Sequence, residues 1–203
     1  MPDEMTHFIR IFRLVKRPKG KIMDILIRAA TKEDATFVAA NVMRSVGNEA
    51  PSPLWIDTMT EICTREDTLY SYRHSCILEV GGELAGSLTA YDGAIYAKAR
   101  ALTFGLFSAR TGNSPVQADF ETGSGEFYLD SLGLLPKFRG HGLGKLLIRD
   151  ALDRAQARGF RLATLIVEAD HPRLIAYYTS TGFREASRLN FLGETYIKMA
   201  QEL

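Results

Sequence analysis

The chain has 203 residues, which is enough for one domain with a sizeable core but short for two. Its composition, 46% hydrophobic and 24% charged, is ordinary for a globular protein, and its net charge of +1 gives no field that would attract nucleic acid or an anionic membrane. No apolar run approaches the roughly 20 residues of a membrane span. We therefore expect no nucleic-acid and no membrane partner. The two cysteines predict free thiols in a reducing compartment, so a cytoplasmic location is the default, and no metal site is predicted.

Residues 1–21 are predicted to be a basic N-terminal extension, and residues 22–203 a single domain. Residues 8–15 could form one short amphipathic helix that ends at Pro18. Such a helix could be a membrane-surface or partner-binding arm. A packed or frayed extension is the interpretation that we favour.

The first elements of the domain follow from local patterns. Residues 24–28 alternate as in a strand, and Thr31 then caps a helix that Gly47 ends. A second helix is predicted over residues 54–65, and residues 67–73 could add a further helical turn.

A β-hairpin is predicted next, with strands at residues 75–80 and 84–91 joined by Gly81 and Gly82. Residues 92–124 then interrupt the pattern as an insertion. Its first half is predicted to be helical, and its second half is a loop rich in Gly, Ser, Thr and Asn. A segment of this length is more often functional or mobile than decorative, although a surface excursion without a role stays open.

The stretch 126–147 organises the rest of the chain. It begins with an apolar run of strand type, which Pro136 stops because proline lacks the N–H that a strand ladder needs. A glycine-rich turn at residues 139–144 then opens a helix with apolar residues at helical spacing. A strand at 161–167, a helix after Pro172 and a closing hairpin, residues 183–189 with 195–199, complete the chain. Together these elements predict an α/β fold of the α+β type, with a central mixed sheet flanked by helices.

The glycine-rich turn has the properties of an anion site. Glycines leave no Cβ between the backbone amides and a ligand, and the first N–H groups of a helix lack internal partners. Arg139 and Lys145 add cationic donors beside these amides. The turn is neither a P-loop, since Arg139 stands where the first glycine belongs, nor a dinucleotide fingerprint, since its glycines run G-x-G-x-G.

The turn resembles the acetyl-CoA pyrophosphate loop of the GCN5-related N-acetyltransferases, the GNAT superfamily. The residues that match are Arg139-x-x-Gly142-x-Gly144, directly after a strand. A second motif supports the resemblance, because Tyr178-x-x-x-Gly182-Phe183 is similar to the family's late Tyr-x-x-x-Gly-Phe signature. The order of elements from Ile25 to Met199 resembles the family's fold. The N-terminal extension and the 92–124 insertion fall outside the resemblance.

The resemblance implies a cofactor site for acetyl-CoA. The pantetheine arm is expected on the backbone of the central strand, and the pyrophosphate on the amides of the turn. The implied cofactor-binding residues are Leu132, Gly133, Leu134, Arg139, Gly140, His141, Gly142, Leu143, Gly144, Lys145, His171 and Tyr178. His171 is a departure, since the family usually carries Asn seven residues before the motif tyrosine.

The resemblance also implies catalytic roles. Tyr178 resembles the family's general acid, which returns a proton to the departing thiolate; an ordinary core aromatic is the alternative. Glu126 lies thirteen residues before Arg139, where histone-type members carry a catalytic Glu, so either Glu126 or an ordered water is the expected base. Asp130, Tyr128 and Tyr91 are the expected acceptor-binding residues. On a strand, Glu126, Tyr128 and Asp130 project to one face.

We therefore expect an acetyl-CoA-dependent N-acetyltransferase acting on a primary amine of a small molecule, peptide or protein. The alternative is a binding module of the same fold that holds acyl-CoA as a sensor or interaction domain without chemistry. A homodimer is plausible, and nothing in the sequence tests it.

Overall fold

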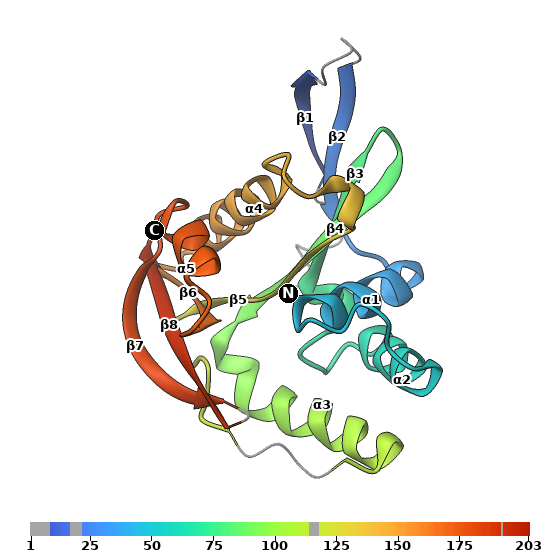
Figure 1. Cartoon of the computed structure of the whole chain (residues 1–203), viewed down its shortest axis with the longest axis vertical. Coiled ribbons are helices and arrows are strands. Elements are labelled where there is room, and N and C mark those ends of the chain that lie inside the picture. The colour runs from blue at the N-terminus through green and yellow to red at the C-terminus, as the bar shows by residue number, and fades with distance from the viewer. Residues whose placement is uncertain (1–8, 17–21, 114–117, 192) are drawn as a thin grey trace.

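The computed structural model describes residues 9–16, 22–113, 118–191 and 193–203. These residues form one eight-stranded sheet in the order β1-β2-β3-β4-β5-β6-β8-β7, with helices around it (Figure 1). Only the pair β5 and β6 is parallel among the strands described; every other neighbouring pair is antiparallel. The mixed α/β fold expected from the sequence is therefore confirmed.

The strands are β1 (Ile9–Lys16), β2 (Ile22–Ala29), β3 (Ser75–Val80), β4 (Glu83–Asp92), β5 (Phe127–Leu134), β6 (Leu162–Glu168), β7 (Arg184–Phe191) and β8 (Glu194–Glu202). The helices are α1 (Ala35–Ser45), α2 (Pro53–Thr64), α3 (Tyr96–Thr111), α4 (Leu143–Ala157) and α5 (Pro172–Thr179). Both expected hairpins, β3–β4 and β7–β8, are present, as are the expected helices that correspond to α1 to α5. Gly81 and Gly82 have the positive φ angles of the turn that joins β3 to β4.

The two faces of the sheet carry different cores, because successive residues of a strand point to opposite sides. Cys76 and Leu78 of β3 pack with α4, whereas Ile77 between them packs with α1 and α2. The core on the α4 side includes Ile27, Leu88, Phe127, Leu147, Ile148 and Ala151. Figure 1 shows α4 and α5 together, away from the group of α1, α2 and α3.

The N-terminal segment differs from the prediction. Residues 9–16 form strand β1, which pairs antiparallel with β2, and not an amphipathic helix. Residues 9–11 alternate apolar and charged, which suits a strand, and the outer edge of β2 offers a backbone partner. Residues 1–8 and 17–21, including the expected helix end at Pro18, lie outside the described residues. The expected helical turn over 67–73 is reduced to a 3-10 turn at Tyr72–His74.

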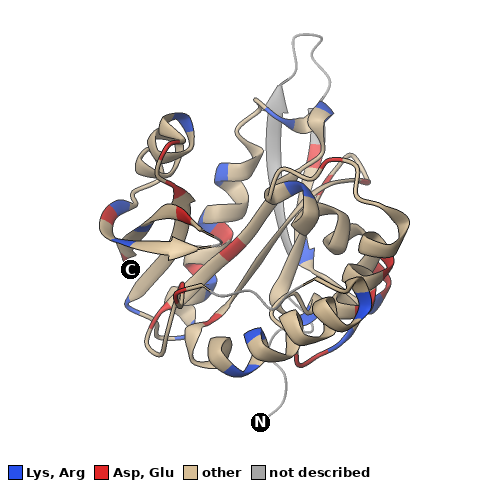
Figure 2. Cartoon of the chain, turned by 60° about the horizontal axis from the view of Figure 1, so that its bottom comes forward, with Lys and Arg blue, Asp and Glu red and all other residues tan. Residues whose placement is uncertain are grey.

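The charges are mixed over the surface. Figure 2 shows Lys and Arg interspersed with Asp and Glu along the elements in its view. None of the helices in the described part of the chain is both long enough and apolar enough to cross a membrane.

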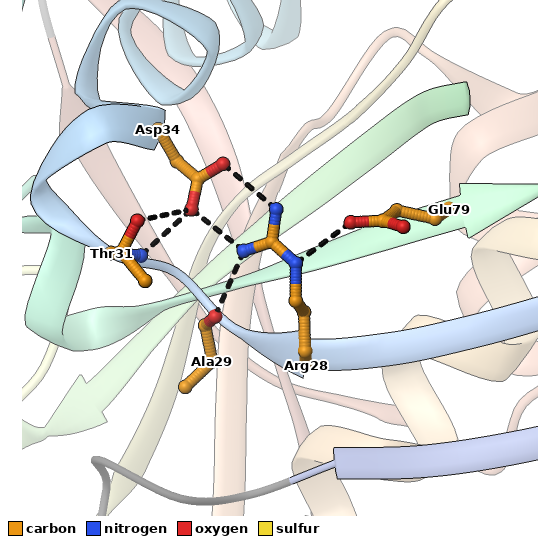
Figure 3. Close-up of polar contacts among 5 residues, drawn as sticks. All are labelled: Arg28, Ala29, Thr31, Asp34 and Glu79. Atoms are coloured by element: carbon orange, nitrogen blue, oxygen red, sulfur yellow. Dashed lines mark hydrogen bonds and ion pairs between the residues drawn. The ribbon is translucent and has the colours of Figure 1, made fainter. Parts of the chain in front are cut away.

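The start of α1 is tied to the sheet by a network around Arg28 of β2 (Figure 3). Its guanidinium donates to both oxygens of Asp34, at 2.7 and 2.9 Å, and to Glu79 of β3 at 2.7 Å. The carboxylate of Asp34 also accepts from the N–H of Thr31 at 2.7 Å. Burial alone would raise the pKa of Asp34, but the hydrogen bonds from Arg28 and Thr31 outweigh it and hold this pKa below its usual value.

Arg28→Met is expected to destabilise the protein by about 2 kcal/mol at pH 7, because it leaves a buried carboxylate without its cation. The folded-state pKa of Asp34 is depressed, so its contribution is present above the unfolded pKa and is lost as the pH falls. The difference between wild type and Arg28→Met should therefore shrink below about pH 4. Urea denaturation across this pH range measures it.

Arg65→Met is the matched control, because Arg65 pairs with Asp67 on the surface and both side chains are exposed. It should change stability little at any of these pH values. Equal destabilisation by the two substitutions would contradict the structural role of Arg28.

Candidate active site

The central feature of the site is a divergence of two strands. β5 pairs with β4 along its length, from Phe127 opposite Asp92 to Leu134 opposite Gly86. It pairs with β6 only at Phe127–Ala163 and Tyr128–Thr164. Among the strands described, none continues this second edge from residue 129 to residue 134. Backbone N–H and C=O groups on that edge are therefore free for another extended molecule.

The glycine-rich turn follows at the end of the same strand. Gly140 and Gly142 have φ angles of +74° and +76°, which L side chains rarely adopt, and the space where a Cβ would stand is open at both. α4 then begins at Leu143, whose side chain is buried in the core on the α4 side. The N–H groups of this first turn have no carbonyl partner within the helix and carry the positive end of its dipole.

Gly144 connects the turn with α5 and β5. A Cβ on Gly144 would clash with the hydroxyl of Tyr177 and would lie 3.6 Å from the Leu132 side chain. Gly133 is equally crowded from the other side, because a Cβ there would lie 2.8 Å from the carbonyl oxygen of Asn41 in α1. The expected cofactor residues of β5 and of the turn are thus brought together, with α1 and α5 packed against them.

Arg139 makes two contacts. Its Nη2 atom donates to Glu49, in the loop between α1 and α2, at 2.7 Å, and its Nε donates to the carbonyl of Leu134 at 3.1 Å. Glu49 also accepts from Arg44 at 3.1 Å. The hydrogen bond from Arg139 is the largest cause that lowers the pKa of Glu49, so this carboxylate is ionised.

The same series of contacts leads from the turn into the sheet. Arg44 donates to the side-chain oxygen of the buried Asn41, and Asn41 donates to Ser87 of β4 at 3.0 Å. Asn41 is also the residue whose carbonyl packs on Gly133. Polar contacts therefore connect Arg139 with the floor of the expected cofactor site.

The two histidines of the cofactor prediction have local roles. The Nδ1–H of His141 donates to the carbonyl of Arg139 at 2.7 Å, and this hydrogen bond stabilises the turn. His171 caps α5, because its Nδ1 accepts from the N–H of Leu174 at 3.3 Å. Lys145 is exposed on the first turn of α4.

Tyr178 lies on α5, half-buried, with its ring edge-on to Tyr177 and Phe183 at centroid distances of 5.3 and 6.2 Å. Burial raises the pKa of its phenol well above the usual value. The phenol therefore carries its proton at neutral pH, as a general acid requires.

Glu126 immediately precedes β5, and its carboxylate is bound by one lysine and two threonine hydroxyls. Lys198 of β8 contacts both of its oxygens, at 2.7 and 2.8 Å, and Thr122 and Thr164 donate to it as well. Burial acts to raise the pKa of Glu126, but these hydrogen bonds, led by that from Lys198, lower it. Glu126 is thus an ion-paired carboxylate of low basicity, and this disfavours it as the base.

Asp130 lies two residues beyond the last β5–β6 pair, at a β-bulge. Thr89 is opposite Ser131 and Ala90 is opposite Leu129, so Asp130 is the extra residue. Its oxygens accept from the Tyr91 hydroxyl and from Ser131 at 2.8 Å. Burial, and next the charge of Glu121, raises the pKa of Asp130 to about 7.

Glu121 comes from the loop between α3 and β5. It is only 8% exposed and accepts from Tyr96 at 2.6 Å and from Tyr128. Tyr128 and Tyr91 are each 1% exposed, so these two expected acceptor residues hold the carboxylates in place and do not form an open binding surface. No group of three or more potential metal ligands occurs among the described residues.

Sequence reasoning missed Glu121 and Glu49. Both lie in loops without periodicity, and their partners are 5 to 90 residues away along the chain. The only sequence signal was the length of the 92–124 insertion, which favoured a functional segment without indicating a residue.

Solved structures share this fold. A protein described only as an acetyltransferase is 27% identical, with 87% of this chain and 98% of that chain covered and a TM-score of 0.71. An N-acetyltransferase from Staphylococcus aureus Mu50 is 18% identical, with 86% and 98% covered and a TM-score of 0.74. PaiA N-acetyltransferase from Thermoplasma acidophilum, solved with coenzyme A, is 15% identical, with 88% and 98% covered and a TM-score of 0.54. The last two are similar in fold alone.

One curated relative matches a short stretch. Mycothiol acetyltransferase from Catenulispora acidiphila is 41% identical over 63 residues, which make up 31% of this chain and 19% of that protein. The match therefore spans about a fifth of the relative's length.

The family model described as Acetyltransferase (GNAT) family matches residues 39–183, well over half of the chain. This range contains β5, the glycine-rich turn, α4 and Tyr178, the features from which the site is built. The chain therefore belongs to the GNAT acetyltransferase family.

Proposed function

We propose that this protein is an N-acetyltransferase that takes its acetyl group from acetyl-CoA and transfers it to a primary amine by direct attack on the thioester. One observation carries the proposal: the edge of β5 without a strand partner ends at a glycine-rich turn and a helix start. An extended arm with amide groups can pair with such an edge, and a pyrophosphate fits the amides of such a turn. Acetyl-CoA has both parts in this order.

The residues present fit the cofactor. Leu132, Gly133 and Leu134 offer the backbone groups for the pantetheine arm. Residues 140–144 offer amides for the pyrophosphate, and Arg139 and Lys145 add cationic side chains, while their own N–H groups donate to Pro136 and Gly142. Acetyl-CoA supplies the activated acetyl group as a thioester. Support for this donor also comes from family membership and from the related fold that was solved with coenzyme A.

Proton transfers are the chemistry that the protein's own residues supply. The amine must lose a proton as its nitrogen forms the N–C bond, and the sulfur must gain one as the C–S bond breaks. Asp130 is our proposed proton acceptor, because a pKa of about 7 suits a base that works near neutral pH. Glu126, bound to Lys198, is a poorer candidate. Tyr178 is the proposed donor to the thiolate.

The acceptor is proposed only as a class. Asp130, near the point where β5 and β6 diverge, favours a cationic amine, because its ionised form attracts a protonated nitrogen. Small molecules, peptide N-termini and lysine side chains all satisfy this requirement. A cytoplasmic location, a homodimer and a single domain over residues 22–203 also stay predictions.

Calorimetric titration of the purified protein with acetyl-CoA, with ATP and NAD as controls, is the first test. We expect selective binding of acetyl-CoA, and at least about tenfold weaker binding by Gly142→Val, since a β-branched residue is strained at this positive φ. Equal binding of the three nucleotides, or unchanged affinity in Gly142→Val, would contradict the cofactor site. Selective binding without CoA release over a broad panel of amines would favour the acyl-CoA-binding module instead.

Asp130→Asn is expected to lower kcat by about 10²- to 10³-fold and Tyr178→Phe by about 10²-fold, because each removes a proton-transfer group. Steady-state release of CoA measures both. Glu126→Gln should reduce kcat less than Asp130→Asn and should lower the melting temperature, since Lys198 loses its ion pair. A larger loss of kcat in Glu126→Gln than in Asp130→Asn would return the base to Glu126.

Glu49→Gln is expected to tighten acetyl-CoA binding about two- to fivefold, because Arg139 no longer pairs with a carboxylate that competes with the pyrophosphate. The same calorimetric titration measures the change. Asp67→Asn, which removes an exposed carboxylate from a pair outside the site, is the control and should leave the affinity unchanged. Weaker binding by Glu49→Gln would mean that Glu49 orients Arg139 for the ligand.

A further inference from the structure

Glu121 is a buried carboxylate that the mechanism above does not use. It lies in the segment between α3 and β5, and its carboxylate accepts from the hydroxyls of Tyr96 on α3 and Tyr128 on β5. Across the described residues, no Lys, Arg or His forms an ion pair with either Glu121 or Asp130. A charge kept in such a place without a cation is costly, so it calls for a reason beyond packing.

The geometry connects Glu121 with Asp130 through two tyrosines. Tyr128, which donates to Glu121, has its ring 5.7 Å from that of Tyr91, measured between centroids. Tyr91 donates to Asp130. Tyr91 and Tyr128 are cross-strand partners in the β4–β5 register, so the sheet itself holds the two rings side by side.

Titratable groups from several elements face this pair. Those acting on Asp130 or in contact with its partners are Tyr70, His74, Tyr91, Tyr96, Glu121 and Tyr128. Burial keeps the four tyrosines protonated and also lowers the pKa of His74. Burial likewise raises the pKa of Glu121, and Arg100 acts in the opposite direction. Among these groups, Asp130 is the one whose pKa lies near neutral pH, at about 7.

We propose that Glu121 is a positioning residue for Asp130: through Tyr128 and Tyr91 it sets the orientation and the charge state of the carboxylate that exchanges a proton with the acceptor amine. This inference rests on the proposed function, because it assigns Asp130 as the proton acceptor. It gives the 92–124 insertion a role, since that segment supplies both Glu121 and Tyr96 and so completes the acceptor end of the site.

A purely structural role makes a different prediction. If Glu121 only satisfies tyrosine hydroxyls, Glu121→Gln should cost stability and leave the titration of Asp130 unchanged. If its charge acts on Asp130, the substitution lowers the pKa of Asp130, because a like charge is removed from the buried network.

The test follows Asp130 directly and then through turnover. The protein is labelled with 13C at its aspartate carboxyls, and the Asp130 resonance is assigned with Asp130→Asn. The midpoint of its titration should lie near pH 7 in the wild type and about one pH unit lower in Glu121→Gln. The acidic limb of the pH profile of kcat should move by the same amount. At pH 6 the ionised fraction of Asp130 then rises from about a tenth to about a half. Acetyl-CoA affinity should stay the same.

Asp119→Asn is the matched control, because it makes the same kind of change on the same loop at an exposed residue whose carboxylate accepts from the N–H of Asn190. It should shift neither titration. Tyr96→Phe serves if Glu121→Gln fails to fold, since it removes one hydroxyl donor to Glu121 at nearly constant volume. The loss of this donor should raise the pKa of Glu121 and shift the acidic limb of the pH profile of kcat.

The outcomes separate the two proposals. An Asp130 titration that is unchanged in both Glu121→Gln and Tyr96→Phe overturns the role of Glu121, even if the enzyme is active. A shifted titration in a protein that binds acetyl-CoA but acetylates no amine supports the coupling of the carboxylates and overturns the proposed transferase function. A shift in both the resonance and the pH profile supports both.

Discussion

The divergence of β5 from β6 after Tyr128 and Thr164 is the constraint on which the rest of the structure depends. A strand in the middle of a sheet normally forms backbone hydrogen bonds with two neighbouring strands. An open edge is costly unless water or a ligand binds its N–H and C=O groups. Here β4 pairs with one edge of β5 from Phe127 to Leu134, apart from the bulge at Asp130, which keeps the strand rigid while the other edge is free. A parallel neighbour makes this possible, because β6 arrives by the α4 crossover and is not bound to β5 by a tight hairpin.

The two faces of β5 have different partners, one apolar and one polar. Phe127 and Leu129 pack into the apolar core under α4, which fixes the strand against the helix that begins at the glycine-rich turn. On the other face lie Tyr128 and Asp130, with hydroxyl and carboxylate partners from β4, α3 and the loop before β5. The bulge at Asp130 lies near the start of the free part of the edge, two residues beyond the last β5–β6 pair, so the acid is placed just past the point where the strands separate.

Elements with a strong local pattern could be predicted from the sequence. The hairpin around Gly81 and Gly82, the turn at Gly140 and Gly142 and the helix after Pro172 depend on near neighbours along the chain. The strand at 9–16 was wrongly expected to be a helix, because its short apolar run fits both periods and the open edge of β2 decides between them. Tertiary contact overrides local preference most easily in such short segments.

The side chains that tune the site could not be found in this way, because their partners come from distant loops. Arg139 and Glu49 are 90 residues apart, and their contact continues through Arg44 to Asn41, against which Gly133 packs. α1 and the loop that follows it thus contact the glycine-rich turn through Glu49 and β5 through Asn41. Under the proposed function, a phosphate that drew Arg139 away from Glu49 would also change the contact that Arg44 of α1 makes with Glu49. This connection uses charged, half-exposed groups that can exchange partners, whereas the Glu121–Asp130 network is buried and keeps its geometry fixed. The site therefore combines an adjustable end at the turn with a rigid end at the carboxylates, which suits a reaction in which a large donor must enter and leave while a proton is transferred at a fixed position.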